Sequence, residues 1–571
     1  MNSDWTGDIV VAFSAEKPSA GRGPANTWTP IAESAPWRLW QQPASSEWKG
    51  FPFRRIEAAG WWIMLLGELY TPANVAEVVS GQRSAADLNG HFLLWAWDEK
   101  KNEWHVWTDR FGTLHAYHAR RLGAAAVGTC SGTVAQLASR RRLDNRALAG
   151  FFGLGFFPLD RTFFEDMRIL RPATHYVFSA AGDEISASRY WDWNYKPDVR
   201  RTYEDTVAEF ASVFGAVMRG MVREGRIALP ISGGLDSRCT VAAIDHPSVW
   251  AYSYGYTEDS AETKIARQVA AARNLPMETF AMQPYLFDQL GRVLACVEGF
   301  QDVTQCRQAA VTQNIAAHAD FIIAAHLGDV WLDAMGQQEA RGDLFHKMAK
   351  KGRAWLQENI CAPMLGEENP EAVLRQFVDE GMKQVEHIQD AEFRAKACKI
   401  GQWSFRWTTT SLRMFQCAAF PRLPFYDTRL ADFFSTVPSE FLPGRRLQVD
   451  YLKRFAPDLA RVKWQPYDAN LYQYRHYDSW LLPKRAVKRG LRMLKGEKVI
   501  ERNWEVQFGG KSGEAGLSHW LLRPGLRLHD LVDRKKVAAL LADFRVAPPE
   551  QGLGWVVSML LTFSAWLESN V

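Results

Sequence analysis

The chain has 571 residues, of which 47% are apolar, including 24 Trp and 32 Phe. This length predicts two large domains with a tail rather than a single core, and the composition excludes a disordered chain. The formal net charge of +4 is too small to indicate nucleic acid as a partner.

The cysteines and the apolar stretches indicate the cellular compartment of the protein. The seven cysteines include no Cys-x-x-Cys pair, which argues against a zinc or iron–sulfur site and favours reduced thiols. The first residues carry no secretion signal, and the apolar stretches 61–66 and 555–566 are shorter than the roughly 20 residues that span a bilayer. We therefore expect a cytoplasmic protein without a transmembrane segment, in which 555–566 is a buried C-terminal helix.

The two halves of the chain have different patterns. From about residue 60 to 190, short apolar segments alternate with turns, which predicts an all-β or layered α+β domain. Segments 92–97 and 104–107 flank a polar turn and predict a hairpin. After residue 202 helical and strand patterns alternate, which predicts βαβ units and a parallel sheet. The predicted helices cover 203–222, 239–244 and 261–273, and the predicted strands cover 227–231 and 248–254.

Pro197 and the charged residues around it predict a linker over 193–201. The predicted domains are therefore 1–195 and 202–480, followed by an extension over 481–571. The extension begins with a basic stretch, 483–495. A solvated helix face is favoured there over a surface for an acidic polymer or a membrane.

The segment between the strand 227–231 and the following helix is rich in small and polar residues. It reads Ser232, Gly233, Gly234, Leu235, Asp236, Ser237. The two glycines let the backbone approach a phosphate and direct N–H groups at it. Asp236 would repel phosphate unless a divalent cation lay between them, so we interpret it as a magnesium ligand. A simple tight turn with Asp236 as a helix cap is the alternative.

This string resembles the pyrophosphate loop of the N-type ATP pyrophosphatases, a group that includes asparagine, GMP, NAD and argininosuccinate synthetases. It lacks the lysine that ends a Walker loop. The resemblance implies ATP and Mg²⁺ as cofactors, with cleavage that leaves AMP and pyrophosphate.

Further segments resemble asparagine synthetase and its relatives, in the same order along the chain. In the first half these are Gly67-Glu68-Leu69-Tyr70, Leu88-Asn89-Gly90-His91-Phe92 and Asp109-Arg110-Phe111-Gly112. In the second half they are Ser253-Tyr254-Gly255-Tyr256, the segment from Glu298 to Arg307, His326-Leu327-Gly328-Asp329, and the segment from Arg422 to Asp427. The resemblance implies a degenerate, glutaminase-like Ntn-hydrolase sandwich joined to a parallel-sheet ATP-pyrophosphatase domain.

Departures from the family pattern bear on function. A glutaminase of this family uses the thiol of an amino-terminal Cys as nucleophile, but position two is Asn2 and no Cys precedes Cys130. Leu66 stands where the family has an Asn. In the second magnesium loop, Ser-Gly-Glu-Gly-x-Asp-Glu in the family, Val330 replaces the last acid. We therefore expect a first domain that does not hydrolyse glutamine.

The resemblance assigns roles by position. The implied ATP- and pyrophosphate-binding residues are Ser232, Gly233, Gly234, Leu235, Asp236, Ser237, Ser253, Gly255 and Gly328, and the implied magnesium ligands are Asp236 and Asp329. Glu298 is the candidate base and Lys463 the candidate cation near the reacting phosphate. A structural ion pair is the alternative for Glu298, and a helix cap is the alternative for Asp329. Arg307, Arg406 and Arg413 are further candidates for substrate or phosphate contacts.

The sequence thus predicts an ATP-dependent carbon–nitrogen ligase that adenylates a carboxylate and couples it to an amine. Relatives without the Cys include β-lactam synthetases and lasso-peptide cyclases, so the substrate could be a small molecule, a peptide or a polysaccharide unit. Ammonia-dependent asparagine synthesis and intramolecular cyclisation are alternatives, and a nucleotide-binding pseudoenzyme is an alternative of another class. The prediction allows a homodimer.

Overall fold

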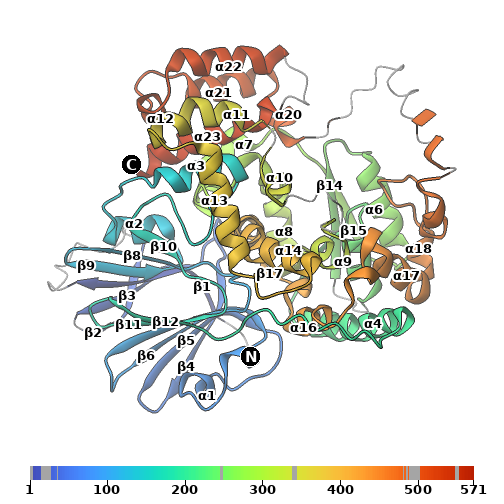
Figure 1. Ribbon diagram of the computed structural model, residues 1–571, viewed down its shortest axis with the longest axis horizontal. Coiled ribbons are helices and arrows are strands. Elements are labelled where there is room, and N and C mark those ends of the chain that lie inside the picture. Colours follow the sequence, from blue (N-terminus) through green and yellow to red (C-terminus); the bar gives the residue numbers. More distant parts are fainter. Residues whose placement is uncertain are drawn as a thin grey trace.

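The computed structural model contains two β-sheets and a helical C-terminal end (Figure 1). It describes residues 4–14, 27–34, 36–244, 249–336, 344–350, 352–479, 481–483, 486–487, 500, 502–546 and 552–571. Asn2 and most of the basic stretch 483–495 lie outside the described residues.

The first sheet is antiparallel and has 12 strands in the described part of the chain. Its order is β10-β8-β9-β1-β4-β5-β6-β7-β11-β12, and β3 joins β2 to β1. The sheet curves into a sandwich, with β8 to β10 above β4 to β6 in Figure 1. The predicted hairpin is confirmed, because β6 pairs with β7 and Trp97 lies opposite Trp104. The strands are β1 (Asp4–Ser14), β2 (Thr29–Ser34), β3 (Trp37–Pro43), β4 (Phe51–Ala58), β5 (Trp61–Leu69), β6 (Gly90–Asp98), β7 (Glu103–Thr108), β8 (Tyr117–Arg121), β9 (Ala124–Gly128), β10 (Met167–Ile169), β11 (Thr174–Ser179) and β12 (Glu184–Arg189).

β5 is almost continuously apolar because both of its faces are covered. Successive side chains of a strand point to opposite faces. Met64 and Leu66 join the core inside the sandwich, whereas Ile63 and Leu65 join a smaller core with helix α1 (Val75–Val79). This strand therefore packs as an internal layer, which explains why its sequence lacks polar alternation.

The second sheet is parallel, as predicted, with the order β15-β14-β13-β16-β17. The chain leaves β13 toward β14 and later returns to the other side of β13 as β16. In parallel α/β sheets, ligands bind at the carboxyl ends of the strands where the order reverses in this way. The loops after β13 and β16 therefore occupy the expected binding position. The strands are β13 (Ile227–Pro230), β14 (Val249–Gly255), β15 (Met277–Ala281), β16 (Phe321–Ile323) and β17 (Phe420–Arg422).

Helices surround this sheet and complete the chain. The predicted helices correspond to α4 (Tyr203–Met221), α5 (Asp236–Ala242) and α6 (Ala261–Ala271). The others are α2 (Ser131–Ala138), α3 (Asn145–Leu154), α7 (Leu286–Val297), α8 (Thr312–His318), α9 (Gly328–Leu332), α10 (Leu344–Met348), α11 (Ala354–Leu356), α12 (Ala362–Leu365), α13 (Pro370–Lys383), α14 (Ala391–Lys399), α15 (Thr409–Gln416), α16 (Thr428–Phe434), α17 (Arg446–Phe455), α18 (Pro457–Arg461), α20 (Asn503–Gln507), α21 (Gly510–Leu521), α22 (Arg534–Val546) and α23 (Leu553–Asn570). A π-helical segment, Ile400–Thr408, precedes α15.

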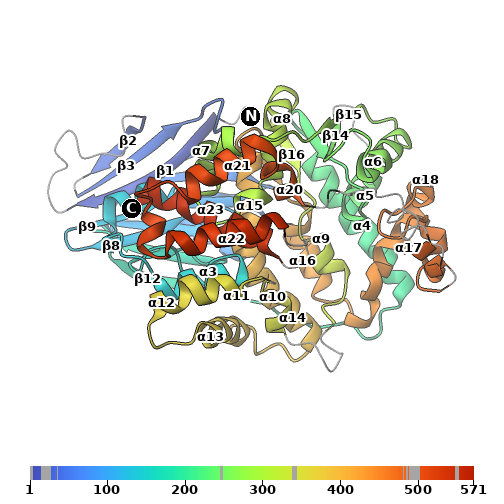
Figure 2. The ribbon, with the colours of Figure 1, turned by 90° about the horizontal axis from the view of Figure 1, so that it is seen from above.

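The C-terminal helices pack against both halves of the chain. Figure 2 shows α21, α22 and α23 side by side, and α21 and α23 contact α7. Trp566 of α23 stacks on Phe163 of the first half with ring centroids 3.6 Å apart. Thr562 Oγ1 accepts a hydrogen bond from Val303 N–H at 3.1 Å. The predicted buried C-terminal helix is therefore confirmed, and it joins the two halves.

Arg422, at the end of β17, makes a second connection between the halves. Its guanidinium donates to both carboxylate oxygens of Glu68 on β5, at 2.8 and 2.9 Å. It also donates to the carbonyls of Met221 and Glu224 at 2.7 and 2.9 Å and lies 3.6 Å from the ring centroid of Phe321. A planar group with this many fixed partners sets the mutual orientation of the two sheets.

Two sequence expectations about the whole chain can be compared with the structure. Cys296 and Cys417 are joined by a disulfide, so the expectation of reduced thiols is wrong for this pair. The two sulfurs meet because α7 packs against α15. The spacing of the two cysteines in the sequence does not reveal this packing. The other five cysteines are free. In the described part of the chain, every helix is too short or too polar to cross a membrane.

The contact between α23 and the first half generates a stability prediction. We expect Trp566→Ala to lower the free energy of unfolding by about 3–5 kcal/mol, because it empties a stacked position in the shared core. Urea unfolding followed by circular dichroism measures this loss. Leu122→Ala, at a side chain that is 96% exposed, is the control and should change the free energy of unfolding by less than about 0.5 kcal/mol. An equally small effect of Trp566→Ala would contradict the joining role of α23.

Candidate functional site

The predicted phosphate loop follows β13 directly and leads into α5. Ser232 Oγ accepts a hydrogen bond from Gly234 N–H at 3.2 Å and lies 3.0 Å from Ser237 Oγ. Ser237 Oγ accepts from Ser232 N–H at 3.1 Å, and Leu235 is fully buried. The serines thus close the loop into a compact turn, and Leu235 anchors it to the core.

Gly233 lies against a segment that comes much later in the chain, around Gln465. Gln465 N–H donates to Gly233 O at 3.3 Å, and a Cβ on Gly233 would lie 2.2 Å from Gln465 Oε1. Neither Gly233 nor Gly234 is among the residues with positive φ. Gly233 is therefore required for close approach rather than for a left-handed turn.

Arg238 holds that far segment in place. Its side chain is fully buried and donates to the carbonyls of Leu459, Val462 and Lys463 at 3.3, 2.8 and 2.7 Å. Burial lowers the pKa of Arg238 to about 10, so it keeps its charge at neutral pH. The guanidinium therefore ties α5 to the chain that carries Gln465.

Asp236 begins α5 and carries the acidic chemistry of the loop. Its Oδ1 accepts from Gln448 Nε2 at 2.7 Å and from Arg445 Nη1 at 3.4 Å. Arg445 Nε also lies 3.7 Å from Asp333 Oδ2. Burial raises the pKa of Asp236 to about 6; Asp329 and Asp333 also raise it, and Arg445 and Gln448 lower it. The site is thus a cluster of carboxylates around one guanidinium.

The loop after β16 touches the loop after β13. A Cβ on Gly328 would lie 2.8 Å from Asp236 Oδ1, and Asp329 follows in the first turn of α9. Leu327 has a φ of 77°, a left-handed conformation that favours glycine. Val330 is buried, 1% exposed, where the resembling family has an acid. The structure therefore brings together Asp236 and Asp329, with one family carboxylate missing.

The end of β14 contributes the third side of the site. Ser253 is buried, and Gly255 packs so closely that a Cβ would lie 2.4 Å from Ser260 Oγ. Arg307 lies beside these residues, and the phenol of Tyr254 raises its pKa. β14 neighbours β13 in the sheet, so these predicted binding residues lie at the same edge as the phosphate loop.

The side chains of Lys463, Arg406 and Arg413 contact groups outside the phosphate loop. Lys463 Nζ lies 3.2 Å from Asp468 Oδ1, and its side chain is 57% exposed. Arg406 donates to two backbone carbonyls of the first half, and Arg413 donates to Cys296 O at 2.6 Å. Among these three, only the backbone of Lys463 is tied to the phosphate loop, through Arg238.

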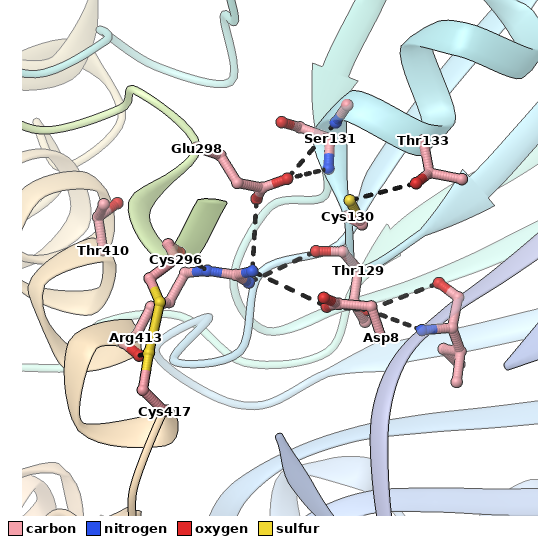
Figure 3. Close-up of polar contacts among 12 residues, drawn as sticks. Asp8, Thr129, Cys130, Ser131, Thr133, Cys296, Glu298, Thr410, Arg413 and Cys417 are labelled. Atoms are coloured by element: carbon pink, nitrogen blue, oxygen red, sulfur yellow. Dashed lines mark hydrogen bonds and ion pairs between the residues drawn. A yellow bond between two sulfur atoms is a disulfide. The ribbon is translucent and has the colours of Figure 1, made fainter. Parts of the chain in front are cut away.

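Glu298 lies in a different environment from the loop (Figure 3). It caps α7 with a φ of 51°, and its Oε1 accepts from Ser131 N–H of α2 at 2.5 Å. Its Oε2 lies 3.6 Å from Arg413 Nη2, and the same guanidinium lies 3.8 Å from Asp8. Burial raises the pKa of the Glu298 carboxyl. The structure thus groups Glu298 with Asp8 and Arg413.

Residues 1–195 contain one cysteine, Cys130. Cys130 is half-buried, and burial, Glu298 and Asp8 all raise the pKa of its thiol. A thiol of raised pKa is a poor nucleophile. Glu68 is bound to Arg422, and Leu66 is fully buried.

The carboxylates of Asp236 and Asp329 suit a magnesium ion whose other ligands are phosphate oxygens and water. In the described ranges, no group of three His, Cys, Asp or Glu side chains is arranged to hold a metal ion. Mg²⁺ usually takes one or two carboxylates and completes its shell with phosphate oxygens and water. Asp236 and Asp329 match that pattern, because Gly328 brings their loops into contact.

Several residues at the site were missed by the sequence reasoning. Arg445 and Gln448 contact Asp236, and Gln465 contacts Gly233. His326 is also at the site; burial lowers its pKa to about 4, and its Nδ1 has no hydrogen-bond partner among the described residues. His326 belongs to a segment that carries the family resemblance, and Arg445 follows a Pro-Gly turn; Gln448 and Gln465 carried no signal.

Comparisons with known proteins cover part of the first half of the chain. Residues 75–191 match the glutamine amidotransferase domain family. Asparagine synthetase [glutamine-hydrolyzing] 3 of Bacillus subtilis (strain 168) is 31% identical over 158 residues, which are 27% of this chain and 25% of that protein. Over these residues the chain is similar to a glutamine-hydrolysing asparagine synthetase.

The matched part spans only about a quarter of the length of that protein. The first half of this chain contains an Ntn-type glutamine amidotransferase domain on an antiparallel sheet, and its second half contains a parallel sheet. A solved structure of glutamine phosphoribosylpyrophosphate amidotransferase from B. subtilis, complexed with ADP and GMP, covers 48% of this chain and 60% of its own. It has 10% identity and a TM-score of 0.19, which is too low to support an argument.

The raised pKa of Asp236 predicts a pH-dependent stability change. The folded protein holds this proton more tightly than the unfolded chain, whose ordinary pKa is 3.8. Ionised Asp236 therefore lowers the free energy of unfolding above about pH 6, and this cost disappears as the pH falls toward about 4. We expect Asp236→Asn to raise the free energy of unfolding by about 1–3 kcal/mol near pH 8 and by much less near pH 4.

Urea unfolding at the two pH values measures this difference. Asp198→Asn, at a side chain that is 45% exposed, is the matched control and should show no pH-dependent gain. A loss of stability in Asp236→Asn at both pH values would mean that the ion pair with Arg445 outweighs the cost of burial.

Proposed function

We propose that this chain is an ATP-dependent carbon–nitrogen ligase that adenylates a substrate carboxylate, releases pyrophosphate, and couples the acyl group to an amine with loss of AMP. The observation that carries the proposal is the contact between the loops after β13 and β16. Ser232 and Ser237 lie on one loop and Asp329 on the other, where the strand order reverses.

Each group of the site has a part in this chemistry. The backbone and hydroxyls of Ser232 and Ser237 would hold pyrophosphate, and Asp236 and Asp329 would hold Mg²⁺, which neutralises phosphate charge when bound. Arg445 already lies against Asp236, and a guanidinium suits phosphate oxygens. In addition to Lys463, we propose Arg445 as a cation that stabilises the reacting phosphate, since most of the catalysis is charge neutralisation and positioning.

The attacking amine must lose a proton, and Glu298 remains the predicted base. A buried carboxyl with a raised pKa suits that role. Its contacts are with Ser131 and Arg413 rather than with the phosphate loop. The assignment therefore requires the amine to reach the loop from the side of the first half.

We propose that glutamine is not the source of the amine. Cys130 is the only cysteine in residues 1–195 and is held as a neutral thiol, and Glu68 is engaged by Arg422. The first half would then act as a scaffold, with free ammonia or an amine of the substrate completing the amide.

A nucleotide-binding pseudoenzyme is the second candidate. Buried Val330 in place of an acid, and Leu327 in a conformation that favours glycine, both weaken the second loop. The second loop still has Asp329, and the loop after β13 still has Asp236 and both serines. These residues favour the enzyme over the pseudoenzyme.

Isotope exchange between pyrophosphate and ATP tests the proposal before any amine is needed. Purified protein is incubated with Mg²⁺, ATP, labelled pyrophosphate and a panel of carboxylates that includes aspartate. We expect exchange that depends on one acid and falls at least about 100-fold in Asp236→Ala. Asp87→Ala, at an exposed surface ion pair, is the matched control and should exchange normally.

The acid that supports exchange decides between the candidates. Exchange with aspartate alone would identify an ammonia-dependent asparagine synthetase, and exchange with another acid would identify a specialised ligase. ATP binding without exchange for any acid in the panel would contradict the ligase and favour the pseudoenzyme.

A further inference from the structure

A second cavity lies between the first half and the C-terminal helices, away from the phosphate loop. Its volume is about 530 Å³. Its walls come from β1, α2, α7, α21 and α23, and they include Asp8, Cys130, Arg292, Glu298, Trp520 and Trp566. We call it the interdomain cavity. Figure 3 shows the carboxylates of Asp8 and Glu298 both directed at the end of the Arg413 guanidinium.

The buried charges of this cavity do not balance. Asp8 and Glu298 are 5% and 8% exposed, and one guanidinium, that of Arg413, lies 3.8 and 3.6 Å from them. Arg413 directs its Nε to Cys296 O at 2.6 Å. Within the described residues, Glu298 Oε2 has no hydrogen-bond partner. Two buried carboxylates therefore share one cation, and one carboxylate oxygen on the cavity wall still needs a donor.

The other charged groups of the cavity do not supply that donor. Glu47 and Arg292 both line the cavity, and they have opposite signs. Burial lowers the pKa of Arg292, and the charge of Glu47 opposes that effect, so these two opposite charges interact. Burial and the two carboxylates keep the Cys130 thiol neutral by raising its pKa. The lining therefore retains an excess of negative charge.

Aromatic rings supply the remaining walls. Trp28, Trp48, Trp520 and Trp566 all line the cavity. The face of an indole attracts cations, and Arg413 already lies 4.8 Å from the ring centroid of Trp48. Indoles around an unsatisfied carboxylate make a suitable environment for an organic cation, because the rings pack its apolar part and the carboxylate accepts from its N–H groups.

We infer that the interdomain cavity binds a primary ammonium group, with its N–H groups on Glu298 and Asp8 and any apolar part of the ligand against the tryptophans. The site shares Glu298 with the proposed ligase mechanism, but binding of an ammonium group there goes beyond that mechanism and does not depend on ATP. The ammonium could belong to a small organic amine or be free ammonium, and the volume of the cavity admits either.

Calorimetric titration of the full chain, without ATP or Mg²⁺, tests the inference. The probes are benzylamine, the neutral benzyl alcohol, the anionic benzoate and ammonium chloride. We expect benzylamine or ammonium to bind at one saturable site, and benzyl alcohol and benzoate to bind at least about tenfold more weakly, because they cannot replace the charge-assisted hydrogen bonds. Tighter binding of benzylamine than of ammonium identifies an organic amine as the ligand class, and the reverse identifies free ammonium.

Gly291→Leu tests the location without touching a charge. Gly291 lines the cavity within α7, a Cβ there meets nothing within 4 Å, and leucine is a better helix former than glycine. The variant should fold and bind benzylamine and ammonium at least about tenfold more weakly, because the new side chain fills the cavity. Gly401→Leu is the matched control, since Gly401 lines a different cavity and also has open space at its Cβ; its affinity should not change.

Glu298→Gln tests the charge. The amide keeps an acceptor for Ser131 and should weaken binding by about tenfold, whereas the exposed Glu99→Gln should not. Equal binding of benzylamine and benzyl alcohol, unchanged binding in Gly291→Leu, or no binding of any cation would overturn the inference. In the last case a proton shared by Asp8 and Glu298 would account for the charges. Pyrophosphate exchange is measured separately, so either proposal can fail without the other.

Discussion

The hydrogen bonds of Arg422 are the contact on which the arrangement of the molecule depends. One guanidinium at the end of the last parallel strand binds Glu68 of the antiparallel sheet and two carbonyls, one on the last residue of α4 and one just after it. The same contact fixes the two sheets relative to each other and engages a carboxylate of the amidotransferase-type domain. A domain held in this way is suited to support the second half, and α23 adds a connection through the stack of Trp566 on Phe163.

At the phosphate loop, the arrangement is set by sheet order and by one buried arginine. The order β14-β13-β16 brings two loops together at one edge, and Arg238 holds the 459–463 segment so that Gln465 lies against Gly233. Burial, together with the nearby carboxylates of Asp329 and Asp333, raises the pKa of Asp236. This cost in stability is typical of sites that bind a cation or a phosphate group.

The sequence was sufficient for the elements with strong local patterns. The hairpin at Trp97 and Trp104, the strand and loop around Ser232, and the apolar helix at 555–566 all have residues whose spacing carries the information. The contacts of Arg445 with Asp236, of Glu298 with Ser131, and of Cys296 with Cys417 join residues more than 100 positions apart. Such contacts depend on how helices pack, and no local pattern in one sequence encodes that. The interdomain cavity was missed for the same reason.

The most direct test of the account is a crystal structure of the chain with Mg²⁺ and an ATP analogue whose α and β phosphates are joined by a methylene group. The account predicts the β and γ phosphates on the loop from Ser232 to Ser237, with the cation between Asp236 and Asp329 and with Arg445 turned from Asp236 toward phosphate. Two results would contradict the account. One is an analogue bound at another position. The other is a loop that still contacts Gln465 and Arg445, with no phosphate on it, at a saturating concentration of the analogue.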